Sequence, residues 1–138
     1  MKKILTIASI GLLSGCSQQS FEAEFGQPLP QDVVIADSAT VQRGPDTSYF
    51  FRLTDWQDED LSSIVSQSRL QHWTGEPTAS LPVNVPGPPA GRLPEWWDRD
   101  KLSALPEIYG RMDDSAERSW WIFVDRDKSQ LYLNSEDW

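Results

Sequence analysis

Alternating apolar and polar positions mark two β-strands early in the chain. One β-prone run covers residues 33–42, and a second covers 47–54, in which Tyr49, Phe51 and Leu53 share one face. The four residues between them, 43–46, read Arg-Gly-Pro-Asp and have turn chemistry. Because so short a connection joins the two runs, the pattern predicts an antiparallel hairpin.

After residue 54 the hydrophobic period changes from two to about 3.6, which predicts an amphipathic helix. The side of this helix that faces the core is formed by Leu61, Ile64, Val65 and Ser68. Acidic residues at 58–60 stand in its first turn and Arg69 in its last, so the helix dipole is complemented at both ends. Thr54 or Asp55 is the expected N-cap, with Gln57 completing a capping box after Thr54.

The last third of the chain predicts the central strand of a sheet. Within residues 119–125 both faces are apolar, since Trp120, Ile122 and Val124 alternate with Trp121 and Phe123. A strand with two apolar faces is buried on both sides. Residues 131–133 are expected to return beside it, with 125–130 as the turn. The predicted fold class is therefore α+β, with a mainly antiparallel sheet of about four strands, one packed amphipathic helix and a proline-rich loop.

That loop lies between residues 76 and 94. Six of the ten prolines fall there, namely Pro77, Pro82, Pro86, Pro88, Pro89 and Pro94. Such density removes backbone donors and favours polyproline II, so an exposed excursion without regular structure is expected. It could bind an aromatic-lined groove of another protein or lie as a strap over this chain's own tryptophans; the strap is favoured. A short helical or turn segment follows, bounded by Pro106 and Gly110.

The first sixteen residues have the pattern of an export signal. Lys2 and Lys3 precede an apolar run at 4–13, and Leu13-Ser14-Gly15-Cys16 closes it. The run is too short to span a bilayer, which needs about 20 apolar residues. A basic start and a small-residue exit are typical of a cleaved signal, so residues 1–15 are expected to be removed.

The tetrad at 13–16 resembles the lipobox of bacterial lipoproteins. The resemblance implies that the Cys16 thiol receives a diacylglycerol, that the chain is cut before Cys16 and that the new amino terminus is acylated. It also implies a cell-envelope location, and Ser17 in place of aspartate implies the outer membrane, facing the periplasm, in a host of the enteric type. Residues 16–31 are then a lipidated tether, whose Phe21 and Phe25 are expected to pack on the domain and shorten its reach, and 32–138 a single domain. Segments 25–30, 49–53 and 94–97 are similar to small bacterial lipoproteins, which implies no activity.

Composition fits an anchored acidic domain. Cys16 is the only cysteine, so no disulfide can form within the chain and the core alone must stabilise it. Without residues 1–15, ten basic side chains face 21 acidic ones, a net charge of about −11. Such a charge repels nucleic acid, and it suits either solubility or a basic partner or cation.

Two patterns suggest binding sites, each with a plainer explanation. Trp96 and Trp97 could form a platform that stacks on sugars, although aromatic side chains more often build the core. The oxygen-bearing residues spaced as calcium ligands 1, 3, 5 and 12 of an EF-hand loop are Asp125, Asp127, Ser129 and Glu136. Gln130 replaces the glycine of the sixth position, and strands flank the segment, so an acidic hairpin turn is preferred over a metal site.

The function expected from these residues is noncatalytic. His72 is the only histidine, and neither a nucleophile elbow nor a phosphate-binding glycine loop is present in the sequence. The chain is expected to be a membrane-anchored binding or scaffolding lipoprotein without a cofactor, whose acidic surface meets an envelope protein. An immunity-type inhibitor of a basic toxin, or a glycan- or calcium-binding envelope protein, are the alternatives.

Overall fold

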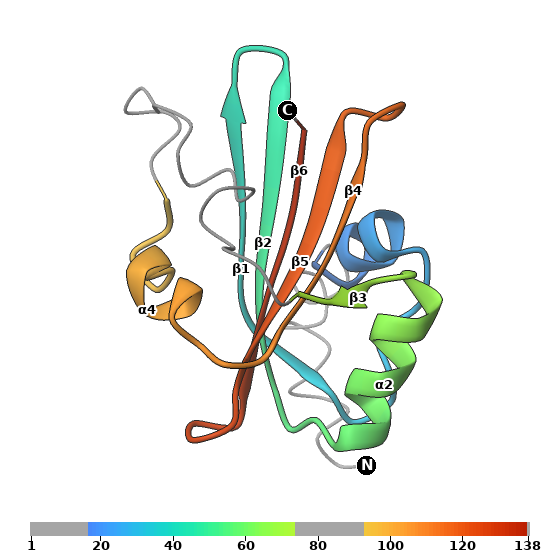
Figure 1. Cartoon of the computed structure of the whole chain (residues 1–138), viewed down its shortest axis with the longest axis vertical. Coiled ribbons are helices and arrows are strands. Elements are labelled where there is room, and N and C mark those ends of the chain that lie inside the picture. The colour runs from blue at the N-terminus through green and yellow to red at the C-terminus, as the bar shows by residue number, and fades with distance from the viewer. Residues whose placement is uncertain (1–16, 74–92, 138) are drawn as a thin grey trace, which may run out of the picture.

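The computed structural model describes residues 17–73 and 93–137. Six antiparallel strands form one sheet in the order β1-β2-β6-β5-β4-β3 (Figure 1). The strands are β1 (Val34–Arg43), β2 (Asp46–Thr54), β3 (Gln71–His72), β4 (Ile108–Asp113), β5 (Arg118–Asp125) and β6 (Gln130–Asp137). The helices are α2 (Asp58–Gln67) and α4 (Arg99–Ser103), and residues 17–25 are also helical. The α+β class with an antiparallel sheet is confirmed, whereas the expected count of about four strands is too low.

Both sequence-predicted hairpins are present. β1 pairs with β2 through the turn after Arg43, and β5 pairs with β6 from Arg118 to Asp125. β5 lies between β6 and β4, and its residues 119–124 are all buried, as a central strand requires. The first hairpin joins the second through the β2–β6 pair, which brings residues about 80 positions apart in the sequence into register.

The two additional strands extend the sheet beyond β5. β4 pairs along its whole length with β5, and β3 adds two residues opposite Tyr109 and Gly110. β4 reads Ile-Tyr-Gly-Arg-Met-Asp, and a glycine inside a strand weakens both its propensity and its alternation. From the sequence, only a helix or turn was expected in this region. The strand was not predicted because the ring that packs over Gly110 is that of Trp121, in the neighbouring strand β5.

The segment expected to be a tether is largely part of the folded domain. Residues 17–25 form a helix, and its Phe21 and Phe25 are 0% and 2% exposed. Phe21 stacks on Phe25 with ring centroids 5.2 Å apart and meets the ring of Phe51 edge-on at 5.7 Å. The tether assignment is therefore wrong for 17–25, because two aromatic rings four residues apart fall on one helix face and bury there together.

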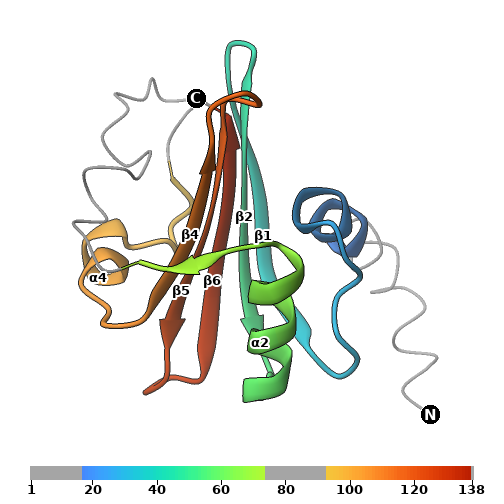
Figure 2. The same ribbon diagram turned by 45° about the vertical axis from the view of Figure 1, so that its right-hand side comes forward.

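Helices cover both faces of the sheet (Figure 2). On one face, the helix at 17–25 and α2 enclose a core whose fully buried members include Phe21, Leu53, Ile64, Ile122, Leu131 and Leu133. On the opposite face, Leu102 of α4 and Trp97 of the segment before it pack with Phe50, Ile108, Trp121, Phe123 and Tyr132 of the sheet. The sheet is thus the middle layer of three, and each strand supplies alternate residues to two separate cores.

The helix at Asp58–Gln67 confirms the prediction from the 3.6 period, with two corrections at its ends. Gln57, and neither Thr54 nor Asp55, is the N-cap residue, and its backbone N–H donates to Asp60 Oδ2 at 2.8 Å. Arg69 lies beyond the last turn with a φ of +59°, so it does not complement the dipole from within the helix. Leu61 and Ile64 face the core as expected.

Several expectations fall outside the described residues. These are the signal peptide at 1–15, the lipid on Cys16 and all of the proline-rich excursion except Leu93 and Pro94. Within 17–73 and 93–137, no helix is long and apolar enough to cross a membrane.

Candidate functional site

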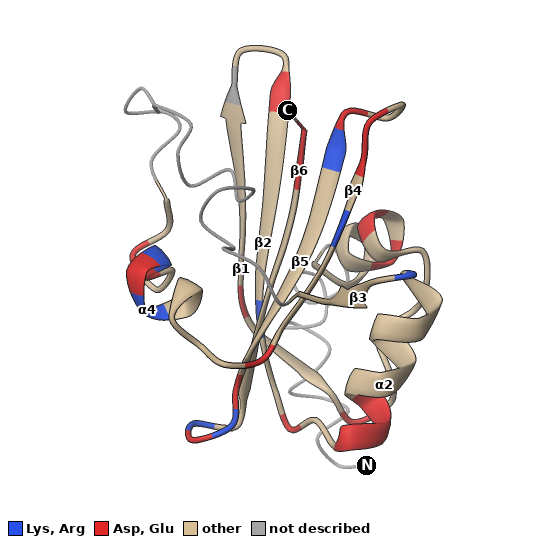
Figure 3. Cartoon of the chain, in the orientation of Figure 1, with Lys and Arg blue, Asp and Glu red and all other residues tan. Residues whose placement is uncertain are grey.

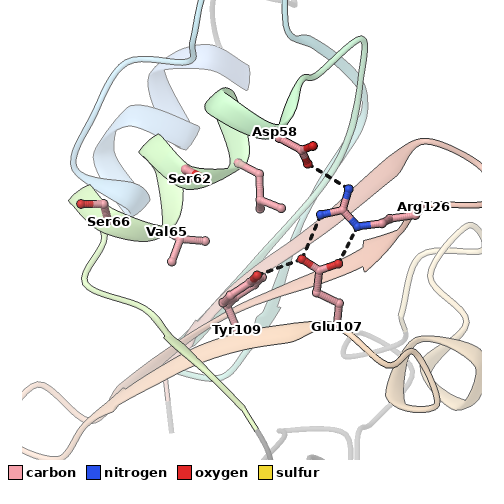
Figure 4. Close-up of a pocket in the computed structure, with 8 residues that line it drawn as sticks. Asp58, Ser62, Val65, Ser66, Glu107, Tyr109 and Arg126 are labelled. Atoms are coloured by element: carbon pink, nitrogen blue, oxygen red, sulfur yellow. Dashed lines mark hydrogen bonds and ion pairs between the residues drawn. The ribbon is translucent and has the colours of Figure 1, made fainter.

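A cleft of about 490 Å³ opens between α2 and β4 (Figure 4). We call it the α2–β4 cleft, and its lining residues are Asp58, Leu61, Ser62, Val65, Ser66, Glu107, Tyr109 and Arg126. Its volume lies in the range of about 300 to 1,000 Å³ that is usual for small-molecule sites. Apolar side chains of α2 form one wall, and charged side chains close one end.

The charged end is a set of mutually paired groups centred on Arg126. Arg126 Nε donates to Glu107 Oε1 at 2.7 Å, Nη2 to Glu107 Oε2 at 3.1 Å and Nη1 to Asp58 Oδ1 at 2.9 Å. The Tyr109 hydroxyl donates to Glu107 Oε2 at 2.8 Å, and the Arg126 guanidinium lies 5.6 Å from the Trp56 ring. These contacts tie the first turn of α2 to the start of β4 and to the β5–β6 turn.

Protonation in this set follows from the same contacts. The hydrogen bonds from Arg126 hold the pKa of the Glu107 carboxyl below its usual value, and the Glu107 bonds raise the pKa of Arg126. Burial, reinforced by Glu107, raises the pKa of the Tyr109 hydroxyl. At neutral pH the set is therefore a carboxylate, a guanidinium and an un-ionised phenol, each already engaged with another. This arrangement links α2 to the start of β4 and to the β5–β6 turn.

Replacing Glu107 by glutamine is expected to remove a small, pH-dependent part of the stability. Because the pKa of Glu107 is lower in the folded chain, its contribution is present above the unfolded value near 4.5 and is lost as the pH falls through the folded value. We expect the variant to be about 1 kcal/mol or less below the wild type at pH 7, since Arg126 is half exposed.

Urea unfolding of both proteins from pH 7 to pH 3 measures this difference. The two curves should converge in acid, whereas Ser62→Ala, on the same cleft, should show a pH-independent difference from the wild type. A gap between Glu107→Gln and wild type that persists at pH 3 would show that Glu107 acts through packing instead of charge.

The two tryptophans predicted as a ligand platform occupy different environments. Trp97 is 6% exposed, and its ring packs edge-on against Phe50, Phe123 and Tyr132 with centroids 5.0, 5.7 and 5.9 Å away. Trp96 is half-buried and lies 6.1 Å from Trp97. Trp96 lines a separate pocket of about 270 Å³ with Tyr132 and charged side chains. Trp97 is thus a core residue, and Trp96 alone keeps an accessible face.

The four calcium candidates do not converge. Asp125 ends β5 and Ser129 lies in the β5–β6 turn, and Asp125 Oδ1 accepts the Lys128 backbone N–H at 3.2 Å. Glu136 is 3% exposed in β6 and is in register with Ser119. Glu136 lies six positions beyond Gln130 along β6, which places it about 20 Å from the turn. Throughout the described parts of the chain, no three Asp, Glu, His or Cys residues, Asp127 included, are grouped to hold a metal ion.

A second polar cluster, which the sequence did not indicate, lies between the helix at 17–25 and the sheet. Arg118 of β5 donates to Glu24, to Asp137 and to the Ser135 hydroxyl, which itself donates to Glu24 Oε1 at 2.7 Å. Trp120 Nε1 donates to the Glu24 carbonyl at 2.7 Å. We call this set the Arg118 cluster. It fixes the amino-terminal helix to β5 and β6, and its hydrogen-bonded partners Ser135 and Glu24 are 111 residues apart, so no local pattern marks it.

A scan against protein-family models, a search of curated proteins and a search of solved structures each found no match to this chain. The geometry above and the amino-terminal motif are therefore the basis for assigning a class of function.

Proposed function

We propose that this protein is a lipid-anchored cell-envelope protein that binds or scaffolds another protein without catalysis. The observation that carries the proposal is the position of the helix at 17–25. In the described part of the chain this helix is seen from Ser17, the residue that follows Cys16 in the sequence, and Phe21 and Phe25 bury it in the core. Ser17 is also bonded to the sheet, since its Oγ lies 2.8 Å from Ser38 Oγ of β1.

A lipid on Cys16 would then be joined to the folded domain by one peptide link. Consecutive Cα atoms are about 3.8 Å apart, so the anchor would leave the domain beside Ser17. A flexible tether of fifteen residues could instead hold a domain up to about 50 Å away. The proposed anchor therefore holds the domain at the membrane surface with a fixed side toward the lipid and the remaining surface toward the envelope. Three acyl chains, at about 0.8 kcal/mol per buried CH₂, make such an anchor durable.

The noncatalytic character is supported by the state of the ionisable groups. In the α2–β4 cleft, Arg126 donates three hydrogen bonds to Glu107 and Asp58, and the Tyr109 hydroxyl donates to Glu107. Groups engaged in this way stabilise the fold, whereas a catalytic acid or base needs a free position toward its substrate.

The partner that fits best carries positive charge. The sequence holds 21 acidic against 12 basic side chains, and Figure 3 shows acidic positions at the first turn of α2 and around the β4–β5 turn. Of these, Asp58, Glu59, Asp114 and Glu117 are exposed. Because both ends of the sheet present carboxylates, a basic protein would be attracted from a distance and oriented on approach. The motif at 13–17 favours the outer membrane, facing the periplasm, in a Gram-negative host.

Capture of the full chain from detergent-solubilised membranes tests this function. At about 0.05 M salt a basic protein should co-purify, and most of it should be lost at about 0.5 M, because the screening length falls well below 10 Å. A variant with Asp58→Asn and Glu59→Gln should retain less partner than one with Ser62→Ala and Ser63→Ala on the same helix. Retention that is indifferent to salt, or a partner without excess positive charge, would contradict the proposal.

A further inference from the structure

The two edges of the sheet are unlike. At one edge stands β3, which has only two residues, Gln71 and His72. At the other stands β1, which has ten residues from Val34 to Arg43 and which, among residues 17–73 and 93–137, pairs only with β2. A long edge strand presents a row of unpaired backbone N–H and C=O groups, and these groups form a template for another strand.

β1 lacks most of the features that block such pairing. Ala36, Ser38, Thr40 and Gln42 are exposed, and none of them carries a charge. The segment 38–42 contains no lysine and no proline, the residues that commonly protect an edge.

Two local features limit the effect of the remaining protective elements, the Asp37 charge and a register shift, on strand pairing at this edge. The carboxylate of Asp37 accepts a hydrogen bond of 2.7 Å from Arg52 Nε within the same sheet, so its charge is neutralised there. The only irregularity in the pairing with β2 is a register shift between Ile35 and Asp37, and from Asp37 onward the register is continuous. In the described parts of the chain, the regular part of β1 has no strand on its outer side, and the contact made there by the helix at 17–25 is a side-chain one, from Ser17 Oγ to Ser38 Oγ.

We propose that the β1 edge pairs antiparallel with β1 of a second copy, which gives a two-fold dimer with one continuous sheet. The uncharged segment 38–42 is self-complementary about Thr40, since Ala39 would lie opposite Val41 and Thr40 opposite itself. Ala39 and Val41 pack at the margin of the core that contains Phe50, so this pair would extend that apolar row across the axis. Opposed threonines in neighbouring strands stabilise a sheet.

The symmetry of this pairing agrees with the anchor. A two-fold axis normal to the sheet reverses the strand direction and leaves each face of the sheet on its own side. The helix at 17–25 packs on the face that contains Phe51 and Leu53, so both copies would carry it on the same side. Both Cys16 lipids could then enter one membrane, and anchoring would present the two β1 edges at the same height. This favours a second copy over a strand of an unrelated protein, and only this part of the argument depends on the proposed function.

Cysteine crosslinking in the full chain tests the pairing. Thr40→Cys places a thiol on the proposed axis, and mild oxidation of membranes should give a covalent species of twice the chain mass. The controls are the wild type, whose only cysteine is Cys16, and Ser62→Cys on the exposed side of α2. Equal crosslinking of Thr40→Cys and Ser62→Cys, or a Thr40→Cys adduct of another mass, would overturn the proposal.

A second pair of variants gives a test that does not need a disulfide. Light scattering of the purified protein in detergent should give a dimer for the wild type and for Thr40→Val. Thr40→Lys should give a monomer, because two ammonium groups would face each other across the axis. A monomeric wild type would also overturn the pairing. Mass spectrometry of the peptide that contains Cys16, from the same sample, distinguishes the two proposals. A dimer without lipid would contradict only the lipid anchor, and a lipidated monomer would contradict only the β1 pairing.

Discussion

Gly110→Ala is expected to lower the free energy of unfolding by about 3 kcal/mol, at the upper end of the usual cost of overpacking a core. A Cβ atom at Gly110 would lie 2.3 Å from Cε3 and from Cζ3 of the Trp121 ring. Trp121 is fully buried and meets the Trp73 ring edge-on at 5.0 Å, so the indole has no room to retreat. The glycine is therefore required by the close approach of a ring from the adjacent strand, and not by backbone conformation.

Urea unfolding of Gly110→Ala beside Met112→Ala measures this effect. Met112 is 42% exposed in the same strand, so its truncation should change the stability by about 0.5 kcal/mol or less. In the double variant Gly110→Ala/Trp121→Leu, the cost should be smaller than the sum of the two single costs, because the clash is removed. Additive costs would show that the ring of Trp121 does not lie on Gly110.

Arg118→Met is expected to lower the free energy of unfolding by about 2 kcal/mol, less than the roughly 3 to 5 kcal/mol for a fully buried ion pair, because this pair is part-buried. The Arg118 side chain is 19% exposed and its partner Glu24 is 15% exposed, and Asp137 and Ser135 complete the set. Methionine would leave two carboxylates close together without a cation. The loss should be concentrated in the helix at 17–25, which Glu24 links to the sheet.

Hydrogen exchange resolved by peptide tests both the size and the place of this loss. Amides of residues 17–25 should exchange faster in Arg118→Met, while those of α2 should change little. The matched control is Arg126→Met, which also removes an arginine with two carboxylate partners. Because Arg126 is 51% exposed, its loss should cost less than about 1 kcal/mol. Unchanged protection of 17–25 in Arg118→Met would contradict a structural role for the Arg118 cluster.

Elements with a clear period could be predicted from the sequence. The alternation at 47–54 gave β2, and the two-sided apolar run at 119–125 gave β5 as a central strand. The 3.6 period gave α2, although its first residue was placed too early because Thr54 and Asp55 are better capping residues than the Gln57 that the chain uses. Local patterns thus predicted the elements in which the spacing of apolar residues alone shows which faces are buried.

Features that depend on distant residues could not be predicted. β4 was missed because the ring that packs over Gly110 belongs to Trp121, which lies in a different strand. The amino-terminal helix was missed because, apart from the buried Phe21 and Phe25, its residues show no helical period of apolar positions. The charged end of the α2–β4 cleft joins Arg126 to Asp58 across 68 residues. No spacing rule brings such positions together before the sheet order is known. For the same reason, the sequence could not show that Trp97 is buried while the neighbouring Trp96 is only half-buried.

The central proposal is that this domain is held at a membrane by a lipid on Cys16, the residue that precedes the packed segment 17–25 in the sequence. Intact-mass spectrometry of the native protein purified from its own membranes tests it most directly. The account predicts a chain that begins at Cys16 and carries the added mass of a diacylglycerol and a further acyl chain. A chain that still begins at Met1, or an unmodified cysteine at position 16, would contradict it.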